Sequence, residues 1–173
     1  MRLKQYTDSN EIIRKYSLKS HPEGGHAQLL YEDQQIIKEQ YLPPGYQGDR
    51  SFWNGIYYLL SKDERSIFHR IRMSELWNFY LGCPLELYDI SPEGQFKKVI
   101  LGDDILQGHE LAYVFPKGHW IGAMPLHNQS YDFSFVSCIT SPGFTFSDWE
   151  KGDRGVLIDL YPHLQEAIIK LTD

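Results

Sequence analysis

The spacing of hydrophobic positions changes twice along the chain. Residues 8–17 carry apolar side chains at helical spacing, and Asp8 opens a capping box ahead of them. Residues 153–171 return to helical spacing, with Pro162 placed where it can begin a helix. The pattern therefore predicts a helix at each end of a central region of a different kind.

The central region consists of short runs rich in Ile, Tyr, Phe, Val and Trp, separated by clusters of Gly, Pro, Asp and Ser. Such regular spacing is typical of strands in a sandwich or barrel rather than of alternating strands and helices. We predict one mainly β domain over 1–173, with a core barrel of about 26–149. The predicted strands are 26–32, 35–42, 52–60, 66–72, 76–80, 84–90, 96–101, 111–115, 119–124, 131–139 and 143–149.

Composition narrows the functional classes. The 173 residues are 42% hydrophobic and 14% aromatic, and the formal net charge is −6, so the basic excess of a nucleic-acid binder is missing. No apolar run approaches the roughly 18 residues of a membrane span. Two cysteines cannot form a disulfide framework. We expect a cytoplasmic protein without a nucleic-acid or membrane partner.

One strand carries the most informative side chain. In the run 66–72, alternation places Ile67, His69 and Ile71 on one face and Phe68 with two arginines on the other. His69 therefore belongs to the inward, apolar face. It is either a core histidine with satisfied nitrogens or a functional group in a pocket.

The spacing from His69 through Glu75 to Gly82 resembles the first motif of the cupin superfamily. The position of that motif's second histidine is occupied here by Ile71. The run Pro116-Lys117-Gly118 resembles the second cupin motif, whose histidine position holds Ile121.

A more specific resemblance extends over nearly the whole chain. The sequence is similar to the cupin-5 type family, a family of unknown function marked by an HPEGG segment. It departs from the family at 26–29 and at Asn78. The resemblance implies a double-stranded β-helix (a cupin or jelly-roll barrel) with short terminal helices, a small-molecule ligand and a homodimer. The matching segments are 21–25, 56–60, 68–70, 75–82, 114–120 and 141–146.

The resemblance also raises the question of a metal. Cupin metal centres use three histidines and a glutamate, and this chain offers His69 and Glu75 with isoleucines at the other two positions. His119 lies two residues from Ile121, about 6.6 Å along a strand, and His26 is a second candidate replacement. We expect no cofactor, with a weakly bound divalent metal on His69 and Glu75 as the alternative.

Without a metal, a carboxylate beside an imidazole fixes its tautomer and raises its basicity. The leading hypothesis is therefore a small-molecule-binding cupin with metal-independent isomerase- or epimerase-like chemistry on a sugar or nucleotide-type ligand. His69 would be the base and Glu75 would orient it, and the acid would be one of three tyrosines (Tyr57, Tyr113 and Tyr131). The alternatives are a non-catalytic metabolite-binding module, a weakly metallated oxygenase or isomerase, and a His–Glu pair that only stabilises the barrel.

Further residues are candidates for ligand binding by residue type. Aromatic side chains can wall a pocket, and polar groups near the barrel rim can steer an anion. Glu23 or His21 could reach a ligand from the HPEGG segment, although the Pro/Gly content favours a plain turn. The candidate ligand-binding residues are Trp77, Trp120, His119, Phe135 and Arg50.

Overall fold

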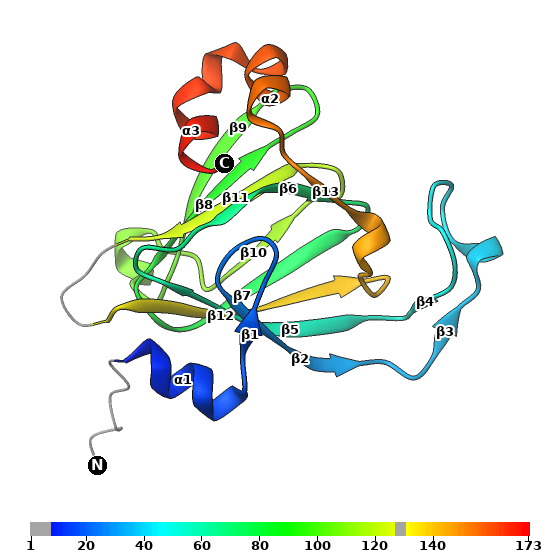
Figure 1. Cartoon of the computed structure of the whole chain (residues 1–173), viewed down its shortest axis with the longest axis horizontal. Helices are drawn as coiled ribbons and strands as arrows, with labels where there is room; N and C mark the ends of the chain where they lie inside the picture. Colours follow the sequence, from blue (N-terminus) through cyan, green and yellow to red (C-terminus); the bar gives the residue numbers. More distant parts are fainter. Residues whose placement is uncertain (1–7, 127–130) are drawn as a thin grey trace.

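The computed structural model describes residues 8–126 and 131–173, which form a barrel of two facing antiparallel sheets (Figure 1). In spatial order, the six-stranded sheet contains β1 (Lys19–Ser20), β2 (His26–Glu32), β5 (Asn54–Ser61), β12 (Phe133–Ser141), β7 (Ser74–Gly82) and β10 (Ala112–Phe115). The five-stranded sheet contains β13 (Trp149–Lys151), β6 (Ser66–Ile71), β11 (Trp120–Pro125), β8 (Leu85–Ile90) and β9 (Phe96–Leu101). The predicted double-stranded β-helix is confirmed.

The helices lie on the outer faces of the two sheets, at opposite sides of the barrel in Figure 1. Helix α1 (Ser9–Tyr16) begins where the Asp8 side chain accepts from the Asn10 N–H. The second helical region is divided into α2 (Arg154–Leu160), a 3-10 turn (Pro162–Leu164) and α3 (Gln165–Lys170). No helix formed by the described residues has the length and apolar character that crossing a membrane requires.

Two predicted strands are wrong in most of their length. The predicted strand 35–42 ends at Ile37 in the short pair β3 (Ile36–Ile37) and β4 (Arg50–Ser51), followed by a 3-10 turn over Glu39–Tyr41. The prolines at 43 and 44 cannot donate to a ladder, which explains why the sheet stops here. The pair projects from the barrel as an arm (Figure 1).

The second error is the predicted strand 143–149. Thr145 and Asp148 form a capping box, which folds Phe146–Asp148 into a 3-10 turn. Pairing resumes only at β13, whose Trp149 lies opposite Ile71 of β6. A further 3-10 turn covers Ile105–Gln107.

Three apolar clusters stabilise the barrel from inside and outside. The largest lies between the sheets and includes Tyr58, Trp77 and Ile121. A second joins Phe68 and Trp120 to the C-terminal helices, and the third joins α1 to the outer face of the six-stranded sheet. The predicted alternation of β6 holds, because Phe68 faces the helices while His69 faces the barrel interior.

Candidate functional site

A cavity of about 470 Å³ opens into the barrel, a size typical of small-molecule sites. Strands of both sheets form its walls, and the loops around 20–23 and 144–146 close its sides. Both predicted catalytic residues, His69 and Glu75, line it. The other lining residues are Ser20, His21, Pro22, Glu23, Ala27, Gln28, Leu29, Glu32, Asn54, Gly55, Ile56, Ile71, Cys138, Thr140, Phe144, Thr145 and Phe146.

The HPEGG segment is a tight loop that delivers Glu23 to this cavity. Gly24 has φ +105°, and a Cβ there would lie 2.0 Å from the Arg65 carbonyl oxygen, so only glycine fits. The loop is tied to the barrel by two bonds. The Ile67 N–H donates to the Glu23 carbonyl at 2.9 Å, and the Tyr58 hydroxyl donates to the Gly24 carbonyl at 2.8 Å. The segment is therefore a glycine-dependent turn that also places Glu23 at the cavity.

The tautomer of His69 follows from its hydrogen bond. Its Nδ1 lies 2.8 Å from the Ile67 carbonyl oxygen, which can only accept, so Nδ1 carries the hydrogen. Nε2 is then the free acceptor of the neutral ring, and it lies 3.4 Å from Oε2 of Glu23. Burial lowers the pKa of His69, while the nearby Glu75 acts in the opposite direction. The orienting role predicted for Glu75 is thus performed by the Ile67 carbonyl.

The two buried carboxyl groups are held close to their protonated form. Burial raises the pKa of Glu23 to about 8, against a smaller opposing effect of the Trp149 indole. Burial and then repulsion by Glu23 raise the pKa of Glu75 to about 7, opposed by His69 and Trp77. Among the described residues, Oε2 of Glu75 has no hydrogen-bond partner. The cavity therefore contains a neutral base beside two groups able to donate a proton near neutral pH.

Two further titratable side chains of the lining, His21 and Cys138, are uncharged near neutral pH. Burial, with a smaller effect of His69, lowers the pKa of His21 to about 4. Its ring lies beside Tyr58 and Phe146, with centroids 5.6 Å and 6.0 Å away. Burial raises the pKa of the Cys138 thiol well above its usual value, and the neighbouring carboxyls add to this.

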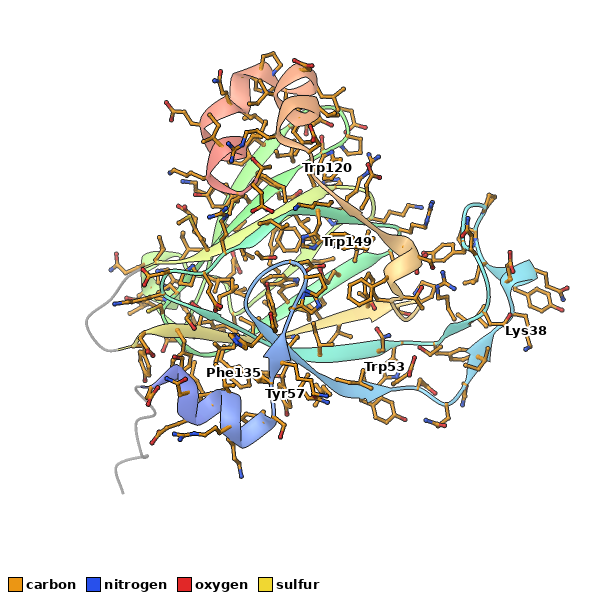
Figure 2. All side chains as sticks on the ribbon, in the orientation of Figure 1. Lys38, Trp53, Tyr57, Trp120, Phe135 and Trp149 are labelled. Atoms are coloured by element: carbon orange, nitrogen blue, oxygen red, sulfur yellow. The ribbon has the colours of Figure 1, made fainter. Side chains whose placement is uncertain are left out.

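The three predicted aromatic ligand-binding residues lie outside the cavity lining. Trp77 is buried in the core, with its ring 5.6 Å from Tyr58. Trp120 is buried under the C-terminal helices, and Phe135 packs 5.3 Å from Tyr16 beneath α1 (Figure 2). Aromatic residue type alone could not separate these packing positions from a pocket wall.

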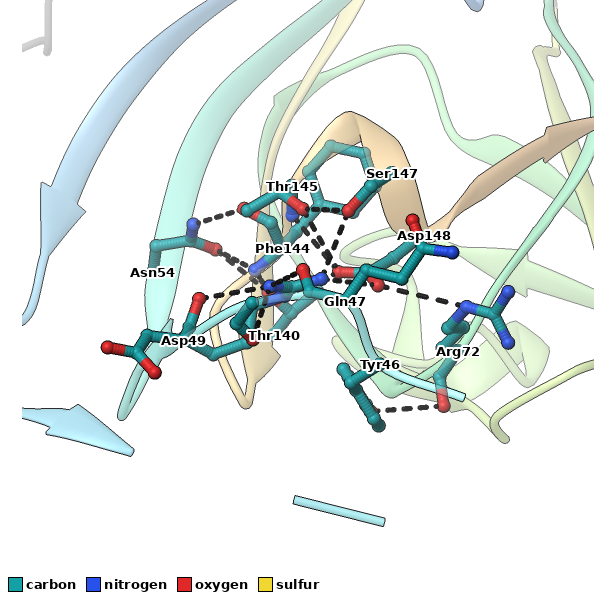
Figure 3. A network of polar contacts seen from close by, with 12 residues as sticks. Tyr46, Gln47, Asp49, Asn54, Arg72, Thr140, Phe144, Thr145, Ser147 and Asp148 are labelled. Atoms are coloured by element: carbon teal, nitrogen blue, oxygen red, sulfur yellow. Dashed lines mark hydrogen bonds and ion pairs between the residues drawn. The ribbon is translucent and has the colours of Figure 1, made fainter. Parts of the chain in front are cut away.

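The two predicted polar ligand-binding residues are engaged elsewhere. Arg50 donates from Nε and Nη2 to the two oxygens of Asp148, each at 2.8 Å. Its Nη1 donates to three backbone carbonyls of the arm. Figure 3 shows the network around Asp148. His119 places its Nδ1 2.6 Å from buried Asp89. Neither Arg50 nor His119 lines the cavity, because each is held by its protein partner.

The predicted tyrosine acids are also placed outside the cavity lining. Tyr57 packs against Tyr16, Tyr113 donates to Asp89 at 2.7 Å, and the Tyr131 ring contacts Phe133. Wall residues that the sequence reasoning missed include Cys138 and Thr140. Their shared parity along one strand is the signal that could have identified them.

The residues present do not fit a cupin metal centre. Ile71 lines the cavity, and Ile121 lies opposite His69 in the β6–β11 pair and packs in the core between the sheets, so both positions hold apolar side chains that cannot bind a metal. Within residues 8–126 and 131–173, no group of three or more His, Cys, Asp or Glu side chains is arranged to hold a metal ion. His69 and Glu75 alone would supply too few ligands.

Comparison with solved structures gives two relatives of nearly equal length. A protein from Shewanella oneidensis is 33% identical, with 96% of this chain and 98% of that chain covered and a TM-score of 0.85. A hypothetical protein from Leishmania major is 26% identical, with 96% and 99% covered and a TM-score of 0.86. No curated protein matches the chain.

A more distant likeness concerns the fold alone. The oxalate decarboxylase of Bacillus subtilis is 12% identical, with 88% of this chain and 36% of that chain covered and a TM-score of 0.52. The family described as Cupin superfamily (DUF985) matches residues 10–152, which is most of the chain. The barrel, the cavity and this match together lead to one conclusion: the chain belongs to the cupin superfamily, in the family DUF985.

Proposed function

We propose that the cavity binds a small molecule and catalyses a metal-independent proton transfer of the isomerase or epimerase type. The observation that carries the proposal is the pairing of a neutral imidazole, with Nε2 free to accept, with the carboxyl of Glu23 at 3.4 Å. An enclosed base beside an enclosed acid is the arrangement that moving a proton within one substrate requires.

His69 is the base of the proposed reaction. Its Nε2 takes a proton from a carbon next to a carbonyl group and becomes an imidazolium. The bond to the Ile67 carbonyl keeps Nδ1 protonated and the ring fixed, so the free lone pair stays directed at the cavity. Burial of the ring excludes the water that would otherwise compete for it.

Glu23 or Glu75 is the acid. Its O–H protonates the carbonyl oxygen as the proton leaves carbon, which gives an enol and a carboxylate. The imidazolium then gives its proton to the other carbon, or to the other face of the first, and an enol O–H returns a proton to the carboxylate. These two transfers complete the isomerisation and restore both His69 and the carboxyl group. A pKa near 7 or 8 makes these carboxyls effective donors at neutral pH.

Isotope exchange tests the chemistry before the natural substrate is known. The protein is incubated in D₂O with a panel of neutral hydroxy-ketones and aldoses, and proton NMR follows loss of the signal next to the carbonyl. We expect at least one compound to exchange tenfold or more above the buffer rate. His69→Asn removes that exchange, whereas His163→Asn, an exposed histidine of the C-terminal region, leaves it unchanged.

The main competing function is a non-catalytic metabolite-binding module. Binding of panel compounds in the cavity without any exchange, in wild-type protein and the His69→Asn variant alike, would favour that module and contradict the proposed reaction.

A further inference from the structure

The charge distribution of the cavity restricts the ligand. Among the residues that the structure describes, no lysine or arginine lines the cavity. The acidic side chains are Glu23 and Glu75 inside and the exposed Glu32 at the mouth. His21 and His69 remain neutral around neutral pH because burial disfavours their charged forms. The cavity therefore has no positive group to offer an anion.

Two arginines, Arg50 and Arg70, are already paired outside the cavity. Arg50 is buried in its pair with Asp148, where both carboxylate oxygens accept from it. Arg70 points to the outer face of β6, where it pairs with Glu150 at 2.8 Å and stacks on Trp120. An anion in the cavity would gain neither of them.

Two polar atoms of the cavity can accept from a ligand. Nε2 of His69 has a lone pair because Nδ1 holds the ring hydrogen. Oε2 of Glu75 is buried and, in the part of the chain that is described, lacks a hydrogen-bond partner. A buried polar atom left unpaired is costly, so a ligand that supplies donors gains at Oε2 of Glu75, and it competes with the Glu23 carboxyl, 3.4 Å away, for Nε2 of His69.

We infer that this cavity selects a small, non-anionic ligand rich in hydrogen-bond donors, and that an ammonium group seated against Glu23 and Glu75 binds better than a hydroxyl in its place. The inference rests on the proposed function and narrows its substrate class. It favours neutral sugars, polyols and amino compounds, and it disfavours the phosphate-bearing nucleotide-type ligands that the sequence had left open. A cation would draw both carboxyls into their charged form and pair with them, which offsets the repulsion between the two charged groups.

Matched probes test the inference directly. Each trio shares one carbon skeleton and differs only in charge, for example benzylamine, benzyl alcohol and benzoate, or glucosamine, glucose and glucuronate. Binding to the full chain at pH 7 is measured by NMR titration. Amide shifts of Gln28, Ile71 and Thr140 restrict the analysis to molecules that enter this cavity.

We expect the amine to bind at least tenfold more tightly than the anion of the same trio, with the alcohol between them. Glu75→Gln keeps the shape of the side chain and removes its charge, and it should reduce the amine-to-anion ratio about tenfold. Glu110→Gln, at an exposed position outside the cavity lining, is the matched control and should leave the ratio unchanged.

Two results would overturn the inference: anions that bind as well as the amines of their trios, or no member of any trio that shifts the cavity amides. The proposed reaction fails separately. If amines bind better than anions but no compound exchanges its proton, the proposed reaction is contradicted and the inferred ligand class still holds. If an anionic substrate exchanges its proton, the inferred ligand class is contradicted and the proposed reaction still holds.

Discussion

Two buried acidic sites in this barrel have opposite surroundings. Asp148 is 4% exposed and receives both forks of the Arg50 guanidinium, with further donors from the 145–148 turn. Glu23 is 8% exposed and faces two imidazoles, His21 at 3.7 Å and His69 at 3.4 Å, both held neutral. The depth is similar, and only the first site has a permanent cation.

The difference separates a structural ion pair from a reactive group. A buried carboxylate is tolerated when it is paired and hydrogen-bonded, and Asp148 meets that condition. Where no cation is present, the group keeps its proton instead, as Glu23 and Glu75 do near neutral pH. Titratable groups left in this state inside a cavity are typical of functional sites.

Removing the cation from the first site is expected to produce the largest effect. Arg50→Ala leaves buried Asp148 with only the more distant Arg72, whose Nε lies 3.8 Å from Oδ1, and it should lower the free energy of unfolding by roughly 3–5 kcal/mol, measured by urea denaturation. The control is Lys38→Ala in the same arm. Lys38 pairs with Asp49 in solvent, so less than about 1 kcal/mol should be lost. Equal losses of stability in the two variants would show that the buried Arg50–Asp148 pair contributes no more than an exposed ion pair, and would contradict its role as a structural ion pair.

Neutralising the second site should have a smaller effect with a defined pH dependence. Folding raises the pKa of Glu75 from 4.5 to about 7, so the folded state binds more protons between these values. The stability linked to that proton is complete below pH 4.5 and is lost as the pH rises through 7. Glu75→Gln does not titrate. The free energy of unfolding of Glu75→Gln, minus that of the wild type, should therefore increase by about 3 kcal/mol from pH 4.5 to pH 8.

Thermal or urea unfolding at several pH values measures this difference. Because His21 and His69 are present in both proteins, their own titrations largely cancel in the comparison. The exposed Glu110→Gln variant should show a flat difference. A flat difference for Glu75→Gln as well would show that Glu75 is ionised and stabilised in the fold, contrary to the second site as described here.

The fold was predictable because it depends on local patterns repeated along the chain. Short runs of strand-forming residues between turn clusters identified β2 and β9 with their observed bounds, and period-two alternation along 66–72 predicted the inward position of His69. The errors fell at 35–42 and 143–149, where proline and a Thr145–Asp148 capping box override strand propensity. The predicted homodimer and cytoplasmic location stay predictions.

The site was less predictable because it depends on contacts between distant segments. Spacing placed His69 and Glu75 together, but the tautomer of the ring depends on the Ile67 carbonyl, which no side-chain pattern encodes. Glu23 reaches the ring from a loop 46 positions earlier, once two glycines turn the backbone. Residue type favoured Arg50 as a ligand-binding group. That prediction failed because Arg50 is buried against Asp148, a contact between distant segments that the sequence does not show.

The smallest expected effect sharpens the comparison within the cavity itself. Four other titratable groups face Glu23 and Glu75: His21, His69 of β6, Tyr58 of β5 and Cys138 of β12.

Burial lowers the pKa of the two histidines and raises the pKa of Tyr58 and Cys138 well above their usual values, so these four stay uncharged between pH 7 and 8. Only the two carboxyls then change, and a bound amine displaces their protons. Its affinity should rise about tenfold over this range, worth about 1.4 kcal/mol, in step with proton release measured by calorimetry in two buffers of different ionisation enthalpy. Glu75→Gln should flatten the rise and reduce the release. Amine binding with no proton release would mean that the carboxyls are charged before the ligand arrives, and the two acidic sites would then differ in geometry but not in ionisation.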